Sequence, residues 1–111
     1  ALFEPRSLTA GRSLFAEGYK AAFARADQVS FAPIFHAGRL SAEERLDVDA
    51  LAGEIAAAGT PATAHGSMEA LVEEAAGGAR KGDVLLFMSS GSFSGAIDRV
   101  LVLLAGSHLR T

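Results

Sequence analysis

The stretch that decides the fold is VLLFMSSGSFSG, residues 84–95, in which five apolar residues run into a loop of small ones. The periodic apolar positions Ile97, Val100 and Leu104 follow directly, so the stretch predicts a strand, a tight loop and a helix start. Backbone N–H groups and the positive end of the helix dipole attract anions at such a junction. Small residues are also what close packing selects, and the loop alone leaves both interpretations open.

Composition limits the classes of protein to consider. The chain has 111 residues, 50% of them hydrophobic and 21% charged, as in one globular domain. Its 10 basic and 13 acidic residues give a net charge of −3, so we expect neither nucleic acid nor a membrane as partner. The absence of cysteine excludes disulfides and thiolate metal sites. With no apolar run of bilayer length and no signal-peptide layout, a cytoplasmic location is expected.

Predicted strands and helices alternate along the chain. The strands are expected at residues 1–3, 29–35, 62–65 and 84–88, the last in the centre of the sheet because it is apolar throughout. Amphipathic spacing and capping signals predict helices through Phe15, Tyr19, Phe23 and Ala26, from Asp47 to about Ala58, from Ser67 to Gly78 and after Gly95, with a helical turn at 41–44. This order predicts one α/β domain in which helices cover both faces of a parallel sheet.

The carboxyl ends of parallel strands open on one edge of the sheet, which brings the segments after each strand together. Arginine binds carboxylates and phosphates through a planar fork, so cations at this edge predict a site for a small anionic molecule. Arg12, at the start of the first predicted helix, also indicates an anion nearby, because that end of the dipole favours negative charge. No role is assigned to the histidines, since a histidine after a strand is more often a capping or surface residue. The segments at this edge contain Glu4, Pro5, Arg6, Ser7, His36, Arg39, His65, Ser67 and the 89–95 loop.

Several catalytic signatures are absent from the sequence. Phe93 stands midway between Gly91 and Gly95, where a nucleophile elbow has serine. No P-loop or dinucleotide-binding glycine fingerprint occurs, and three histidines without cysteine form no recognisable zinc spacing. From its own residues, the chain is expected to bind a ligand rather than transform it.

Two segments become recognisable when taken together. They are Phe3-Glu4-Pro5-Arg6-Ser7-Leu8-Thr9, before a predicted helix, and Met88-Ser89-Ser90-Gly91-Ser92-Phe93. In this order they resemble the C-terminal domain of the Mur ligases, and residues 26–29, 32–35 and 44–47 extend the resemblance over essentially the whole chain. Within the family, the similarity is greatest to the ligases that join the murein tripeptide L-Ala-γ-D-Glu-meso-diaminopimelate to UDP-N-acetylmuramate in peptidoglycan recycling.

The resemblance implies a Rossmann-like three-layer sandwich, the third domain of an ATP-dependent amide ligase. In such enzymes a central domain holds ATP and Mg²⁺, and the C-terminal domain closes over it with the incoming amine. The chain is therefore expected to be excised from a longer protein, as its opening Ala1-Leu2-Phe3 without an initiator Met also indicates, and to be inactive alone. No catalytic or metal-binding residue is expected in it. The implied acceptor-binding residues are Arg6, Ser7, Arg12, Ser90, Gly91, Ser92 and Phe93.

Two positions depart from the family pattern. Ser90 stands where the family usually has Asn, and Ile97 stands where it has His, which bears on the acceptor that is taken. Related ligases that add single amino acids share this domain. The alternative hypothesis is a self-contained, non-enzymatic α/β module that binds a small anionic metabolite. A P-loop upstream of Ala1 would favour the ligase, and a start codon directly before Ala1 would favour the module.

Overall fold

The computed structural model describes residues 1–5, 16–34, 41, 46–89 and 91–109. None of the helices in these ranges has the length and apolar character needed to cross a membrane. The elements in chain order are β1 (Leu2–Phe3), α1 (Ala16–Phe23), β2 (Val29–Phe31), α2 (Val48–Ala57), β3 (Ala62–Ala64), α3 (Met68–Gly78), β4 (Phe87–Met88), the short 3-10 helix η3 (Phe93–Gly95) and α4 (Ala96–Leu109).

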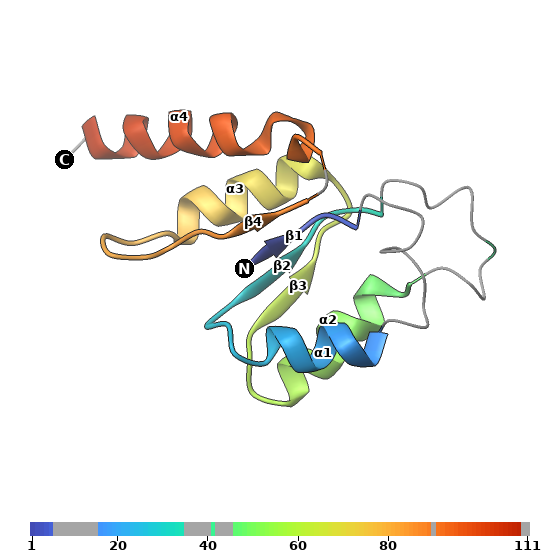
Figure 1. Cartoon of the computed structure of the whole chain (residues 1–111). Helices are drawn as coiled ribbons and strands as arrows, with labels where there is room; N and C mark the ends of the chain where they lie inside the picture. The colour runs from blue at the N-terminus through green and yellow to red at the C-terminus, as the bar shows by residue number, and fades with distance from the viewer. Residues whose placement is uncertain (6–15, 35–40, 42–45, 90, 110–111) are drawn as a thin grey trace.

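The described strands form one parallel sheet in the order β3-β2-β1-β4. β1 lies inside the sheet, where Leu2 pairs with Ser30 of β2 on one side and with Phe87 of β4 on the other. Figure 1 shows α1 and α2 on one face of the sheet and α3 and α4 on the other. The predicted α/β class is confirmed, and the three layers have a Rossmann-like arrangement.

The second and third predicted helices are confirmed together with their caps. The Asp47 carboxylate accepts a hydrogen bond of 3.0 Å from the backbone N–H of Ala50 at the start of α2. At the start of α3, the Ser67 hydroxyl accepts one of 3.2 Å from the N–H of Ala70. Each cap satisfies an N–H group that has no partner inside the helix, which fixes the first turn locally.

Other predicted boundaries extend too far. β2 ends at Phe31 and β3 at Ala64, and residues 32–34 lie outside any strand. α1 ends at Phe23, because the chain turns there and the N–H of Ala26 donates to the Phe23 carbonyl over 3.1 Å. The predicted start of this helix and most of the turn at 41–44 lie outside the described residues.

The prediction that residues 84–88 form the central strand is wrong. β4 spans two residues and lies at the edge of the described sheet, paired with β1. Leu85 and Phe87 pack against the core under α3 and α4, whereas Val84 and Leu86 are 85% and 55% exposed. The continuous apolar run therefore reflects one buried face and one exposed apolar face, rather than a strand buried on both.

The hydrophobic core has two parts, one on each face of the sheet. On the α1 and α2 face, aromatic rings form the centre, with Phe23 and Phe31 edge to face at 5.4 Å. The buried residues on that face are Phe23, Val29, Phe31, Leu46, Leu51, Ala52 and Ile55. Those on the α3 and α4 face are Leu2, Ala32, Leu71, Val72, Phe93, Ala96 and Val100.

Replacement of Ile55 by alanine is expected to destabilise the domain strongly. Ile55 is 1% exposed, so its truncation leaves a cavity against the sheet and lowers the free energy of unfolding by about 2–5 kcal/mol. Urea denaturation measures the change. Leu101→Ala is the control, since Leu101 is 58% exposed and a surface truncation changes stability by only about 0.5 kcal/mol. Equal losses in the two variants would contradict this assignment of the core.

Candidate functional site

The strand order creates a topological switch point between β1 and β4. The chain passes from β1 to β2 and β3 on one side, and then returns to the other side of β1 as β4. In open parallel sheets, ligands bind at the carboxyl ends of the strands beside such a point. Glu4 and Pro5 follow β1 there, and Ser89 follows β4. The candidate site is therefore built on these residues and the loop that continues to Gly95.

Glu4 connects the end of β1 to the loop after β4. Glu4 is only 2% exposed, and its backbone N–H donates to the Met88 carbonyl over 3.0 Å. The Ser89 hydroxyl donates a hydrogen bond of 2.7 Å to Glu4 Oε1, and the Ser94 hydroxyl lies 3.5 Å from Oε2 as a weaker donor. A hydrogen bond to a carboxylate is about twice as strong as a neutral one, so this contact fixes the loop to the centre of the sheet.

The loop itself has an unusual backbone. Phe93, Ser94 and Gly95 have φ angles of 55°, 52° and 74°, all in the left-handed region. For residues other than glycine this conformation costs about 1–2 kcal/mol each, and it persists only where the surroundings hold it. Two sets of contacts hold the loop in this conformation. Ser89 and Ser94 bind Glu4, and the buried Phe93 ring packs edge to face against Phe87 at 5.3 Å.

The hydrogen-bond donors of this loop are arranged differently from those of the anion site that the sequence predicted at the start of the helix. η3 precedes the helix, and α4 begins at Ala96, so residues 92–94 are not its first turn. The N–H groups of Gly91 and Gly95 donate to Ser89 Oγ and to the Ser92 carbonyl, over 3.1 and 3.2 Å. The carboxylate that the loop hydroxyls bind belongs to Glu4, within the same chain.

The predicted site residues have different positions in the structure. Gly91 and Ser92 are exposed on the loop, next to Ser89 and the Glu4 carboxylate. Phe93 is 1% exposed, because its ring completes the core under α4, so it shapes the loop from below and its ring does not line an open pocket. Outside the described residues lie Arg6, Ser7, Arg12, His36, Arg39 and Ser90.

His65 lies at the same edge but below the surface. It is 8% exposed, and its Nε2 lies 3.4 Å from Oε2 of Glu74 on α3, without the alignment of a hydrogen bond. The imidazole is therefore buried against Glu74 of α3. Among the described residues, no group of three or more His, Cys, Asp or Glu side chains could hold a metal ion.

The sequence placed Glu4 at this edge of the sheet, but no role was predicted for it. The signal for it was an acidic residue directly after an apolar strand, within the segment that carries the family resemblance. Its partner Ser89 is 85 positions away, so the pairing becomes visible only when β1 and β4 are known to be neighbours.

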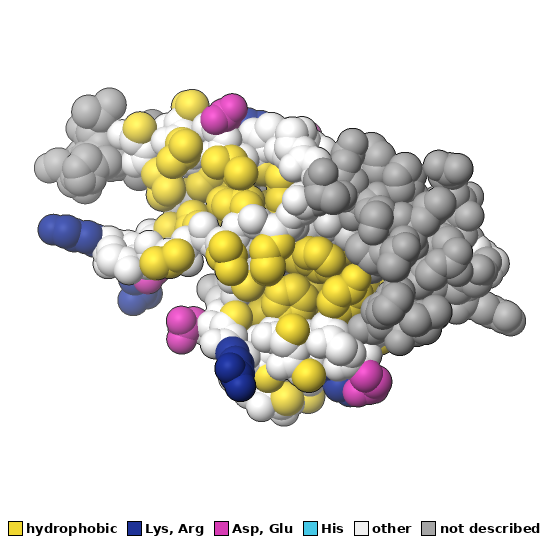
Figure 2. Space-filling model, in the orientation of Figure 1, with side chains coloured by type: hydrophobic (Ala, Val, Ile, Leu, Met, Phe, Trp, Pro, Cys, Tyr) yellow, Lys and Arg dark blue, Asp and Glu magenta, His cyan; other side chains and the backbone are white. Residues whose placement is uncertain are grey.

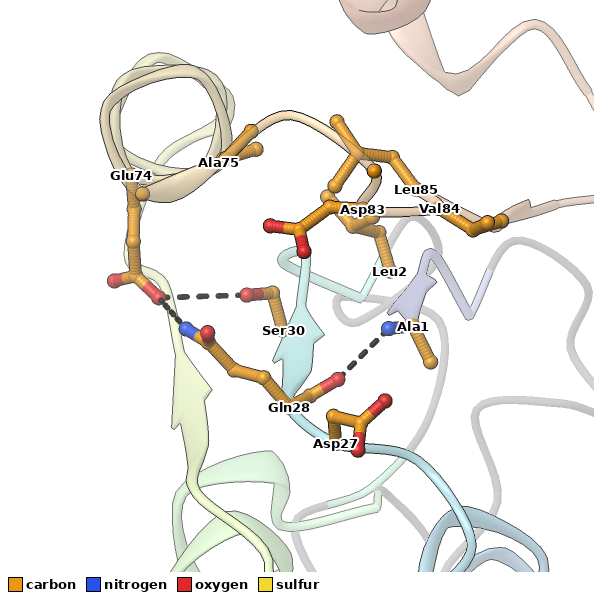
Figure 3. A pocket seen from close by; sticks show the side chains of 13 residues that line it. Ala1, Leu2, Asp27, Gln28, Ser30, Glu74, Ala75, Asp83, Val84 and Leu85 are labelled. Atoms are coloured by element: carbon orange, nitrogen blue, oxygen red, sulfur yellow. Dashed lines mark hydrogen bonds between the residues drawn. The ribbon is translucent and has the colours of Figure 1, made fainter.

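A cavity of about 320 Å³ opens at the opposite edge, by the amino ends of β1 and β2 (Figure 3). Three of its polar side chains contact one another, since Glu74 Oε1 accepts from Gln28 Nε2 at 3.2 Å and from Ser30 Oγ at 3.5 Å. The backbone nitrogen of Ala1 donates to the Gln28 carbonyl over 2.7 Å. Because ligands bind parallel sheets at the carboxyl edge, we place the candidate site at Glu4 and the loop.

Comparisons with known proteins add no assignment. No family model matches the chain, and neither a search of curated proteins nor one of solved structures gives a match. The function is therefore argued from the sequence motifs and from the geometry of the carboxyl edge.

Removal of the Ser89 hydroxyl is expected to destabilise the domain. Ser89→Ala deletes the 2.7 Å bond to a buried carboxylate and leaves Glu4 Oε1 short of a donor, which lowers the free energy of unfolding by about 1.5–3 kcal/mol. Ser92→Ala is the matched control, because Ser92 is exposed and its side chain makes no capping bond, and its effect is about 0.5 kcal/mol or less. Comparable losses in urea denaturation would refute the role of Glu4 as the loop anchor.

Alanine substitutions at two glycines are expected to have opposite effects. An added Cβ meets no atom within 4 Å at Gly95 or at Gly53, so only the backbone conformation distinguishes them. Gly95→Ala forces alanine to φ +74° and destabilises by about 1 kcal/mol, whereas Gly53→Ala inside α2 stabilises by about 0.5–1 kcal/mol. Thermal unfolding of both variants measures the difference, and a neutral Gly95→Ala would show that the loop is not held in the left-handed conformation.

Proposed function

We propose that this chain is the acceptor-binding C-terminal domain of a Mur ligase, of the kind that joins L-Ala-γ-D-Glu-meso-diaminopimelate to UDP-N-acetylmuramate in peptidoglycan recycling. The proposal is supported by one observation, which is that the two segments on which the resemblance rests are in contact. Glu4 of the first accepts a hydrogen bond of 2.7 Å from Ser89 of the second, although 85 positions separate them. This contact lies at the switch point, where a ligand of a Rossmann-like sheet is expected.

The tripeptide is an acceptor whose chemistry suits this edge. It carries several carboxylates, and the arginines Arg6 and Arg12 are the side chains in this part of the sequence that bind carboxylates as a planar fork. Gly91 and Ser92 are exposed beside the anchored loop, and the proposal places the extended peptide against them. In the proposal, Ser7 and Ser90 complete the contacts, and the amine of the tripeptide is held for attack on the activated muramoyl carboxyl.

ATP and Mg²⁺ do not fit the residues of this chain. The sequence has no P-loop, and the described residues offer no cluster of metal ligands. The proposal therefore assigns both to the central domain of the same longer, cytoplasmic enzyme. The chain alone is expected neither to hydrolyse ATP nor to bind the tripeptide tightly, because closure onto the other domains completes the site. Tight binding of the tripeptide by the 111-residue chain in calorimetry would contradict the prediction that the other domains are needed to complete the site.

Substitution of Arg6 tests the proposal in the complete protein that contains this chain. Arg6→Ala is expected to lower kcat/KM for the tripeptide by about 10- to 100-fold, the loss of a charge-assisted hydrogen bond worth about 1.5–3 kcal/mol. The readout is ADP formation that depends on both tripeptide and UDP-N-acetylmuramate. Arg25→Ala is the control, since Arg25 is exposed in the turn before β2, at the other edge of the sheet.

The possible results distinguish the ligase function of the protein from the role of Arg6 in it. An unchanged rate and affinity in Arg6→Ala would remove Arg6 from the site but leave the ligase intact. No tripeptide-dependent ADP formation in the unmodified protein, together with a coding sequence that starts directly before Ala1, would instead favour the self-contained module that binds an anionic metabolite.

A further inference from the structure

Apolar residues of α4 lie on the face that packs against the core and also on faces that the rest of the domain leaves exposed. Ala96 and Val100 face the core and are 0% and 1% exposed. The neighbouring apolar residues point elsewhere, and in the space-filling view apolar side chains gather over this helix (Figure 2). An apolar patch on a protein surface often marks a contact with another molecule, so this part of α4 is a candidate docking surface. Its exposed apolar residues are Ile97 (43%), Leu101 (58%), Val102 (71%) and Leu103 (43%).

Part of this surface lines a groove between α3 and α4. The two helices lie side by side on one face of the sheet (Figure 1). The groove encloses about 400 Å³, and its apolar lining comes from Val72 of α3 and from Val102 and Leu103 of α4. A space of this size admits several apolar side chains, and Val72 at its base is 2% exposed.

The rim of the groove is acidic. Glu69, Glu73, Asp98 and Arg99 surround the apolar lining. The guanidinium of Arg99 forms a surface ion pair with Glu69, whose Oε1 lies 3.8 Å from its Nη2 across the two helices. Glu73 and Asp98 form no ion pair with the rest of the described chain and leave two negative charges beside the apolar lining.

We propose that the α3/α4 groove docks an amphipathic helix whose apolar stripe is flanked by Lys or Arg. Two parallel ridges with a groove between them accept a third helix by the ordinary packing of ridges into grooves. The apolar lining would receive the stripe, and the basic flanks would meet Glu73 and Asp98. An acidic partner or an anionic membrane would be repelled by the same two carboxylates. The site is separate from the carboxyl edge and does not rest on the ligase assignment.

The probe is a fluorescein-labelled synthetic peptide of about 14 residues, roughly four helical turns, with Leu along one face and Lys on the other. The control peptide has Glu in place of Lys. Fluorescence anisotropy with the 111-residue chain is expected to give at least tenfold tighter binding of the Lys peptide, with an affinity that falls as salt is added. Equal binding of both peptides, or no binding of the Lys peptide, would overturn the proposal.

Two matched pairs of exposed variants locate the binding. Val102→Gln in the groove is compared with Val84→Gln at β4, since both valines are exposed, at 71% and 85%. Asp98→Lys is compared with Asp49→Lys, since both aspartates are exposed in the first turn of a helix and give the same change of net charge. Binding of the Lys peptide is expected to weaken about tenfold in Val102→Gln and in Asp98→Lys, and to stay unchanged in the other two.

The same variants give the results that contradict the inference. Loss of binding in Val84→Gln, with none in Val102→Gln, would place the peptide at the edge of β4. Self-association of the chain in sedimentation that is abolished by Val102→Gln would identify a second copy, rather than a basic helix, as the occupant. Circular dichroism confirms that all four variants keep their helices, so each binding result can be interpreted.

Discussion

The hydrogen bond from the Ser89 hydroxyl to Glu4 is the contact on which the carboxyl edge of the sheet depends. A carboxylate that is 2% exposed is stable only when donors satisfy it, and here both donors come from the loop after β4. The same contact holds the loop in a left-handed conformation and brings two distant segments to the switch point. The buried Glu4 side chain therefore links the end of β1 to the loop that leads into α4.

The structure distributes its apolar residues unevenly. The face under α1 and α2 is centred on packed aromatic rings, and the other face is closed by Leu71, Val72, Phe93 and Val100. At β4 and along α4, however, apolar side chains reach the surface, with Val84 and Val102 the most exposed. Apolar patches of this kind on a protein surface mark contacts with other molecules or domains. A domain that closes onto others and a groove that docks a helix are both compatible with this distribution.

The sequence predicted what is decided locally. Asp47 and Ser67 fixed the starts of α2 and α3 because a cap acts within three residues, and alternation of strands and helices was enough to predict a parallel sheet. The position of β4 was not predictable in the same way, since an apolar run looks alike at the centre of a sheet and at an edge with one exposed apolar face. The pairing of Glu4 with Ser89 was not predicted, because the two residues lie 85 positions apart.

The sheet order also has a consequence for how the chain reaches its fold. β1, the first described strand, lies between β2 and β4, and its parallel partners come from residues 29–31 and 87–88. Contacts of such sequence separation close large loops, which slows folding. Until the segment from Phe87 to Ser89 arrives, the Glu4 carboxylate has no donor from the loop and one side of β1 is open. The described sheet is therefore complete around β1 only when β4 is in place, so its first and last strands depend on each other.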